Sequence, residues 1–214
     1  MVTYTLIAIC VIIYAAEWIP KLDVAGVLLY APVTTETQPW RMLTSVFVHS
    51  QDFIPHLFLN MYALYVLGRA LEPVFGRLRF LTIFLVSGLA GSVAVLLLAA
   101  PGQAVVGASG AIFGLFGALF VLQLKRRSDI RQVVILLVIN GAIAFLPGAQ
   151  IAWQAHVGGL IGGALVTAGM IYAKPGASQK LLQAASVIGV LVLLLALTLW
   201  KIPALHAISL QYVF

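Results

Sequence analysis

Long apolar stretches are the feature that most constrains how this chain can fold. Several of them reach the roughly 17–25 residues that a helix needs to cross a bilayer. Of the 214 residues, 63% are hydrophobic and only 8% are charged. This leaves too few polar side chains to cover the surface of a soluble domain. The sequence therefore predicts an all-α polytopic membrane protein.

We expect seven membrane spans, separated by proline, glycine and basic residues. Their expected ranges are about 4–19, 54–71, 80–99, 109–124, 131–148, 152–173 and 181–200. The seventh span carries no polar constellation, so we expect it to be peripheral. The first span is not preceded by the basic segment of a secretory signal, and we interpret it as retained. The single cysteine, Cys10, lies in that first span, which excludes a disulfide within the chain.

The lysine and arginine residues predict the orientation of the spans, because cytoplasmic connections carry an excess of them. Nine lie on one side: Arg69, Arg77, Arg79, Lys125, Arg126, Arg127, Arg131, Lys174 and Lys180. Three lie on the other: Lys21, Arg41 and Lys201. This places the N-terminus in the cytoplasm and the C-terminus outside. The first outer connection, about residues 20–53, is long and semi-apolar, and we expect it to lie at the membrane interface.

The net charge of +6 does not indicate a nucleic-acid partner. The basic residues lie between the apolar spans and form no stripe interleaved with aromatic side chains. We therefore expect the lipid bilayer, and no nucleic acid, as the surroundings of this chain.

Four polar residues fall at a similar depth in the expected spans. Counted from a charged residue at the inner end of the same span, Ser109 lies about 24 Å along its helix and His156 about 27 Å, at 1.5 Å per residue. By the same count Asn60 and His56 lie at about 18 and 24 Å. Because the hydrocarbon core is about 30 Å thick, all four share one layer somewhat below the outer surface.

Ser109 and His156 make a candidate nucleophile and base, because a serine hydroxyl is a poor nucleophile until an adjacent base accepts its proton. The fourth and sixth spans must then touch closely. Small-residue ridges allow two helices to approach in this way. The ridges are formed by Gly110, Gly114 and Gly117 on the fourth span and by Gly159 and Gly163 on the sixth.

An acyl-transfer site also needs hydrogen-bond donors for the oxyanion that develops on the carbonyl. The backbone N–H of Ser109 is available at a helix N-terminus. His56 and Asn60, spaced four residues apart, project from one helix face and can supply side-chain donors. No aspartate or glutamate is near enough in this layer to complete a triad. We therefore expect a dyad, with no metal and no cofactor.

Each of these residues also has a plainer interpretation. Ser109 and the glycines fit ordinary helix packing, Asn60 can bridge two helices, and an intramembrane histidine also occurs in proton relays and ligand sites. A transporter or channel is the competing class. It would show charged residues within the spans and paired broken helices in two halves. The sequence has no such halves, and Glu17 is its one candidate buried carboxylate.

The remaining polar and aromatic residues are assigned structural roles. We expect His49 and His206 to lie at the interface, and Glu72 and Arg41 to tie down loop and helix ends. The tryptophans expected in interfacial belts are Trp18, Trp40 and Trp200.

Taken together, the motifs resemble the rhomboid intramembrane serine proteases over roughly residues 40–165. The pair WR at 40–41 resembles the first-loop motif of that family, and "HLFLNMYALYVLG" from His56 is similar to its second-helix HxxxN pattern. The segment GASG at 107–110 corresponds to the GxSG motif. "AHVGGLIGG" from Ala155 is similar to the sixth-helix AHxxGxxxG pattern.

The resemblance implies a role for each site residue. Ser109 would be the nucleophile, His156 the general base, and the oxyanion hole would consist of the Ser109 amide, His56 and Asn60. Phe113 stands where some relatives have a tyrosine stacked on the histidine. Supporting positions are Gly107, Gly110, Phe113, Gly159 and Gly163.

The resemblance also implies an architecture and a substrate class. Residues 1–175 would form a six-helix rhomboid core whose active-site cavity opens to the outer side. Residues 176–214 would add a linker and a C-terminal seventh transmembrane helix. The substrates would be single-span or other transmembrane proteins, cut near the outer ends of their helices, at the plasma membrane if the source is prokaryotic. A catalytically silent relative that binds clients is the alternative, and loss of the serine or histidine would mark it.

Overall fold

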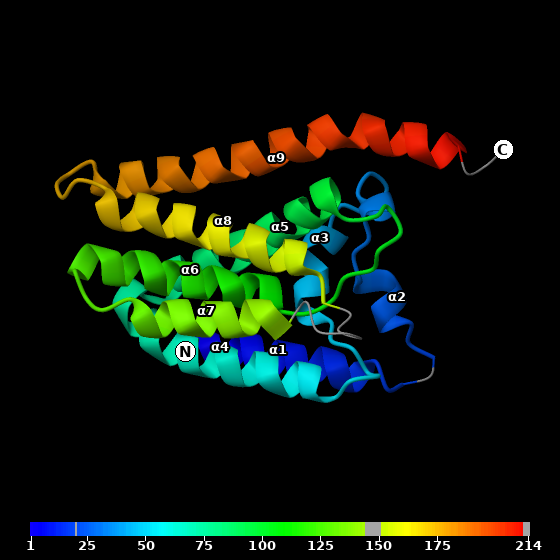
Figure 1. Ribbon diagram of the computed structural model, residues 1–214, viewed down its shortest axis with the longest axis horizontal. Helices are drawn as coiled ribbons and strands as arrows, with labels where there is room; N and C mark the ends of the chain where they lie inside the picture. Colours follow the sequence, from blue (N-terminus) through cyan, green and yellow to red (C-terminus); the bar gives the residue numbers. More distant parts are fainter. Residues whose placement is uncertain (20, 144–150, 212–214) are drawn as a thin grey trace.

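The computed structural model describes residues 1–19, 21–143 and 151–211, and these form an all-helical bundle (Figure 1). The longer helices of this described part are α1 (Val2–Ala16), α4 (Pro55–Phe75), α5 (Arg77–Leu98), α6 (Ser109–Arg126), α7 (Arg131–Ile143), α8 (Trp153–Tyr172) and α9 (Gln179–Gln211). The connection from α1 to α4 holds the short elements α2 (Val24–Leu28), η1 (Pro32–Thr34), α3 (Arg41–Thr44) and η2 (Ser45–Phe47).

The long helices follow the predicted spans to within a few residues, apart from the ends of α4 and α9. α4 continues to Phe75, past Pro73, and α9 runs to Gln211. The fifth predicted span corresponds to α7, and residues 144–148 of that prediction lie outside the described residues. Helices α5, α6, α8 and α9 (to Leu205) are long and apolar enough to cross a membrane by length and composition. α1 and α7 are shorter apolar helices. The polytopic all-α fold is thus confirmed, and the number of seven spans stays a prediction.

The connections alternate between the two ends of the bundle. The α4–α5, α6–α7 and α8–α9 connections lie at one end, and the long α1–α4 connection lies at the other (Figure 1). The first group carries most of the basic residues that predicted a cytoplasmic side. The bundle therefore agrees with the alternation on which the predicted topology rests.

The centre of the bundle is a block in which α8 packs against both α5 and α6. Glycines on one face of α8 bring it close to α5. A Cβ atom added at Gly162 would lie 2.5 Å from the Cβ of Ala90, and one added at Gly158 would lie 2.5 Å from the Ala90 carbonyl oxygen. Real Cβ atoms do not approach that closely. This second glycine face of α8 was not part of the predicted ridge.

α1 packs against α4 and is fastened there by a carboxylate. Glu72 accepts hydrogen bonds from the backbone N–H groups of Val2 (2.7 Å) and Thr3 (2.9 Å) and from the Thr3 hydroxyl (2.6 Å). These first amides of a helix have no partner within it, and a carboxylate also suits the positive end of the helix dipole. The prediction that Glu72 ties down a helix end is confirmed.

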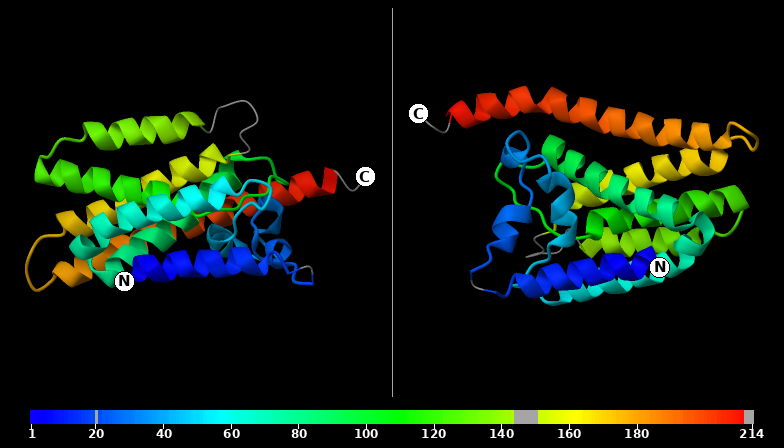
Figure 2. Two further views of the ribbon diagram at one scale, coloured as in Figure 1. Left: turned by 90° about the horizontal axis from the view of Figure 1, so that it is seen from below. Right: turned by 180° about the vertical axis from the view of Figure 1, so that it is seen from behind.

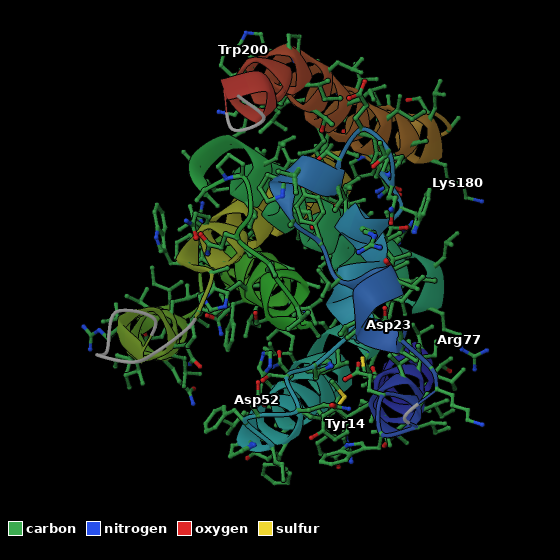
Figure 3. All side chains as sticks on the ribbon, turned by 90° about the vertical axis from the view of Figure 1, so that its right-hand side faces the viewer. Tyr14, Asp23, Asp52, Arg77, Lys180 and Trp200 are labelled. Atoms are coloured by element: carbon green, nitrogen blue, oxygen red, sulfur yellow. The ribbon has the colours of Figure 1, made fainter. Side chains whose placement is uncertain are left out.

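α7 and α9 lie at the edges of the bundle (Figures 1 and 2). α9 packs on α8 and α5, and Gln183 donates a 2.7 Å hydrogen bond to the Met170 carbonyl. Most of the apolar surface of α9 is nevertheless exposed, and Lys180 and Trp200 point away from the bundle (Figure 3). The predicted peripheral position of the seventh span is confirmed.

The outer connection is folded against the segment that precedes α6. Tyr30 and Val105 exchange two backbone hydrogen bonds of 3.2 and 2.7 Å. Arg41 donates through Nη1 to the Leu29 carbonyl at 3.1 Å and through Nε to Gln38. The prediction that Arg41 ties down a loop is confirmed. The side chains of Trp18, Trp40 and Trp200 are exposed, and their role as interfacial anchors stays a prediction.

Candidate active site

Ser109 and His156 meet where α6 and α8 cross. The Ser109 Oγ and the His156 Nε2 are 2.9 Å apart. If the hydroxyl donates this bond, the neutral ring carries its proton on Nδ1. That Nδ1 is buried and has no hydrogen-bond partner within the described part of the chain. The arrangement is a serine with an adjacent base, and no carboxylate among the described residues completes a triad.

The glycine face of α8 that meets α6, the predicted ridge of Gly159 and Gly163, sets this separation. A Cβ added at Gly159 would overlap the carbonyl oxygen of Gly110, and one added at Gly163 would overlap that of Gly114. The two backbones are therefore in direct contact just below the serine and histidine. Gly117, farther down α6, meets α8 backbone in the same way. The predicted small-residue ridges do bring these helices together.

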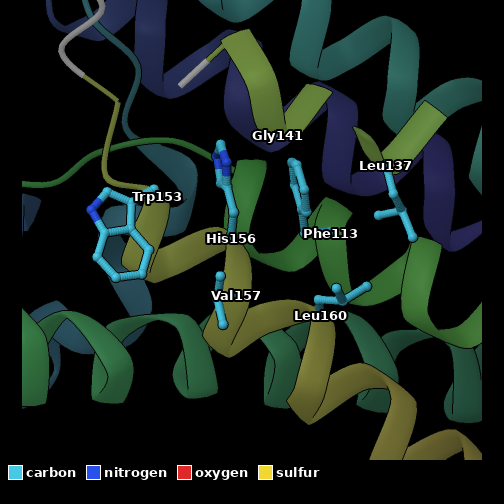
Figure 4. Close-up of a pocket in the computed structure, with 7 residues that line it drawn as sticks. All are labelled: Phe113, Leu137, Gly141, Trp153, His156, Val157 and Leu160. Atoms are coloured by element: carbon cyan, nitrogen blue, oxygen red, sulfur yellow. The ribbon is translucent and has the colours of Figure 1, made fainter. Parts of the chain in front are cut away.

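Phe113 supports the ring of His156. The two rings are stacked, with centroids 4.1 Å apart and planes inclined by 7° (Figure 4). The His156 side chain is buried. Its orientation is fixed by two contacts, the Phe113 ring on one face and the Ser109 hydroxyl at Nε2. The structure therefore places Phe113 where the resemblance implied.

A cavity of about 180 Å³ adjoins this ring pair between α6, α7 and α8 (Figure 4). Its lining is almost wholly apolar apart from the imidazole. The lining residues are Phe113, Leu137, Gly141, Trp153, His156, Val157 and Leu160.

Gly107 shapes the turn that leads into Ser109. Its φ angle is +117°, a conformation that L side chains rarely adopt. A Cβ at this position would also lie 2.7 Å from the Nε2 of His56. Its backbone N–H donates to the Ser45 carbonyl at 3.0 Å, which anchors the turn to the outer connection. Glycine is required here for two independent reasons.

His56 of α4 lies beside this turn, and Asn60 follows it four residues farther along the same helix. The structure indicates which atoms of each can donate. The backbone N–H of Ser50 donates to His56 Nδ1 at 3.3 Å. In the neutral ring the proton is then on Nε2, the atom that faces Gly107. The Asn60 side-chain nitrogen donates to the His56 carbonyl at 2.7 Å. A primary amide has two N–H donors, so one remains for another acceptor.

His49 is the residue that the sequence interpretation placed wrongly. It was expected at the interface, yet its side chain is 1% exposed and lies beside His56, with ring centroids 5.3 Å apart. Burial, with a smaller contribution from His56, lowers the pKa of His49 to about 4. Folding of the connection brings it to the backbone of Ala108. His206 lies outside the residues whose side chains the structure describes.

The described residues contain no group of three or more histidine, cysteine, aspartate or glutamate side chains that could hold a metal ion. The chemistry that this arrangement can perform is acyl transfer, because a hydroxyl with an adjacent base lies at a helix N-terminus whose first N–H can donate to an oxyanion, and His56 lies beside the preceding turn.

Comparison with known proteins identifies the family. The model of the Rhomboid domain matches residues 36–173. Rhomboid protease GluP of Bacillus subtilis is 37% identical over 151 residues, which are 68% of this chain and 29% of GluP. RHOMBOID-like protein 5 of Arabidopsis thaliana is 33% identical over 68% of this chain and 48% of its own length. Putative rhomboid protease YdcA of B. subtilis is 33% identical over 60% of this chain and 65% of its own length.

The chain thus spans from under a third to about two thirds of the length of these relatives. The matched region contains the Ser109–His156 pair, the turn before it and the helices that position both. The family match and the long apolar helices both indicate a protein that crosses the membrane several times. This chain is a multi-pass integral membrane protein and belongs to the rhomboid family.

Proposed function

We propose that this protein is an intramembrane serine endopeptidase that hydrolyses peptide bonds in or near transmembrane segments of other membrane proteins. The observation that carries the proposal is the 2.9 Å separation of Ser109 Oγ and His156 Nε2. A hydroxyl within hydrogen-bond distance of a neutral imidazole is the minimal arrangement that activates a serine. Its position in a family that includes proteins named rhomboid proteases supports the assignment.

The reaction would proceed through an acyl-enzyme. Ser109 Oγ attacks the scissile carbonyl carbon while His156 Nε2 accepts the hydroxyl proton. Negative charge develops on the carbonyl oxygen and is stabilised by the Ser109 amide, the His56 Nε2–H and the free N–H of Asn60. His156 then donates its proton to the leaving amine. A water molecule, deprotonated by His156, hydrolyses the acyl-serine and restores the hydroxyl.

Charge and packing support the rest of the proposal. The excess of basic residues on one side supports a cytoplasmic N-terminus, with the C-terminus and the active-site opening on the outer side. We assign residues 1–175 to the catalytic core and residues 176–214 to a linker and an added helix, since α9 covers only an edge of the bundle. The apolar cavity beside His156 suits substrates that are themselves apolar.

The test is cleavage of a panel of single-span substrates by detergent-purified protein, with wild type and Ser109→Ala compared side by side. We expect wild type to cleave at least one substrate and Ser109→Ala to cleave none. Thermal stability should be nearly unchanged, because one small residue replaces another. Cleavage by Ser109→Ala at a rate near wild type would overturn the assignment. Binding of the panel without cleavage by either protein would favour a silent, client-binding relative.

A further inference from the structure

The segment before the nucleophile is held by two backbone amides with different partners, and the amide of the nucleophile follows them. The Gly107 N–H donates to the Ser45 carbonyl at 3.0 Å. The Ala108 N–H donates to the Nε2 of His49 at 3.5 Å. The Ser109 N–H is the first of α6 and has no acceptor within its helix. His49 thus holds the amide next to the one that the proposed oxyanion hole uses.

The partner of His49 Nδ1 determines whether Nε2 donates or accepts in the contact with Ala108. His49 Nδ1 lies 3.3 Å from the Phe47 carbonyl oxygen, which can only accept a hydrogen bond. Nδ1 must therefore carry the proton, and in the neutral ring Nε2 is an acceptor for the Ala108 N–H. The ring bridges the outer connection and the turn before Ser109 with one donor and one acceptor.

His49 and His56 are consequently neutral rings of opposite tautomer, side by side. His56 accepts at Nδ1 from the Ser50 N–H and has its proton on Nε2. His49 has its proton on Nδ1 and accepts at Nε2. Both depend on the backbone of residues 47–50, one through Phe47 and the other through Ser50. The same short segment thus orients the side-chain donor His56 and the turn that presents the Ser109 amide.

We propose that His49 is a positioning residue for the oxyanion hole: by binding the Ala108 amide it holds the turn that directs the Ser109 N–H toward the substrate carbonyl. This role rests on the proposed protease function, because the donors matter when charge develops on that oxygen. His49 itself touches no reacting atom. Its removal should affect the transition state more than substrate binding.

Two polar substitutions separate the two ring nitrogens. His49→Gln can place a carbonyl oxygen near the position of Nε2 and so keeps an acceptor for Ala108. His49→Asn keeps a donor near the position of Nδ1 but ends short of Ala108. Gln183→Leu is a matched control, because it removes a buried hydrogen bond, to the Met170 carbonyl, on the distant helix α9. All three are compared with wild type for kcat and KM per folded molecule.

Loss of a single oxyanion donor typically lowers kcat by about 10²–10³, and a displaced donor should cost less. We expect His49→Asn to lower kcat by at least about tenfold with KM within about twofold, and His49→Gln to stay within about threefold of wild type. Hydrogen exchange of the 106–110 backbone should be faster in the Asn variant only. Gln183→Leu should lower the melting temperature and leave kcat unchanged.

The outcomes distinguish this inference from the proposed function. If wild type cleaves, Ser109→Ala does not, and His49→Asn retains wild-type kcat, the positioning role is wrong and the protease assignment stands. Equal losses in the Asn and Gln variants would also overturn it, because they would reflect a general need for the ring. If wild type cleaves no substrate although its 106–110 backbone is protected from hydrogen exchange, the proposed protease function is wrong. The catalytic role of the His49–Ala108 contact is then wrong as well.

Discussion

Substituting Gly159 by alanine adds one methyl group at the contact between α6 and α8. The new Cβ would overlap the carbonyl oxygen of Gly110, the residue that follows the nucleophile. Carbon and oxygen atoms in such contacts stay roughly 3.3–3.6 Å apart, so the two helices must separate locally by at least about 1 Å. The distance between Ser109 Oγ and His156 Nε2, now 2.9 Å, would rise to at least about 3.9 Å, beyond the range of a hydrogen bond.

The expected loss follows from that displacement. A misplacement of about 1 Å in a catalytic group costs on the order of 10²-fold in rate, and overpacking of this kind costs about 1–3 kcal/mol of stability. We therefore expect Gly159→Ala to lower kcat about a hundredfold in protein that remains folded. The assay is initial-rate cleavage of one single-span substrate in detergent, divided by the folded fraction from a thermal melt.

Two other glycines provide graded controls. A Cβ at Gly110 would lie 3.2 Å from the Ala155 carbonyl oxygen, which a shift of a few tenths of an ångström relieves. Gly110→Ala should therefore lose less than about tenfold. At Gly189, on α9, a Cβ would meet nothing within 4 Å, and the alanine variant should match wild type. If Gly159→Ala were folded and as active as Gly189→Ala, the backbone contact would not set the geometry of the dyad.

Three further predictions concern the oxyanion hole, the topology and the response to pH. Asn60→Ala should lower kcat by at least about tenfold with a smaller change in KM, and an unchanged kcat per folded molecule would remove Asn60 from the site. A cysteine at position 103 should react with an impermeant thiol reagent from outside, whereas one at position 126 should not, because the basic residues predict that side to be cytoplasmic; the natural Cys10 is fully buried. Labelling with the sides reversed would invert the topology. Burial and His56 lower the pKa of His49 from 6.5 to about 4. Between pH 4 and 6.5 the unfolded chain therefore binds more protons than the folded protein, so the free energy of unfolding should fall as pH decreases from about 6.5 to 4. Thermal melts across that range, with His49→Gln as a less sensitive reference, check this, and equal profiles would contradict it.

The spans and the Ser109–His156 pair could be predicted from the sequence because both depend on helical geometry. A helix rises by a fixed amount per residue, so polar residues could be compared in depth by counting. The glycine spacing on α6 and α8 then indicated which faces meet. The motif resemblance to rhomboids independently singled out the same residues.

His49 could not be placed in this way because it lies outside the regular helices. Its contact with Ala108 joins residues 59 positions apart, through a connection whose path no periodicity describes. A signal was present in hindsight: His49 precedes His56 by seven residues across a turn-forming stretch that contains Pro55. That spacing permits the rings to meet, but only the folded connection determines that they do.

The tautomers of the histidines were likewise beyond the sequence. They are determined by which backbone groups approach each ring nitrogen, and these belong to Phe47, Ser50 and Ala108. The second glycine face of α8 was visible in the text "HVGGLIGG", where the glycines come in adjacent pairs. Adjacent residues on a helix point about 100° apart, so paired glycines indicate two helix neighbours rather than one.

The two glycine faces of α8 differ in which second-site changes can restore a damaged protein. At Gly162 the obstacle to an added methyl group is the Cβ of Ala90. The double variant Gly162→Ala with Ala90→Gly exchanges the two methyl groups and should recover packing. At Gly159 the obstacle is a backbone carbonyl oxygen, which every amino acid carries. No partner substitution can remove it, so a selection for revertants should yield compensating pairs at the α5 face and only same-site reversion at the face that holds the dyad.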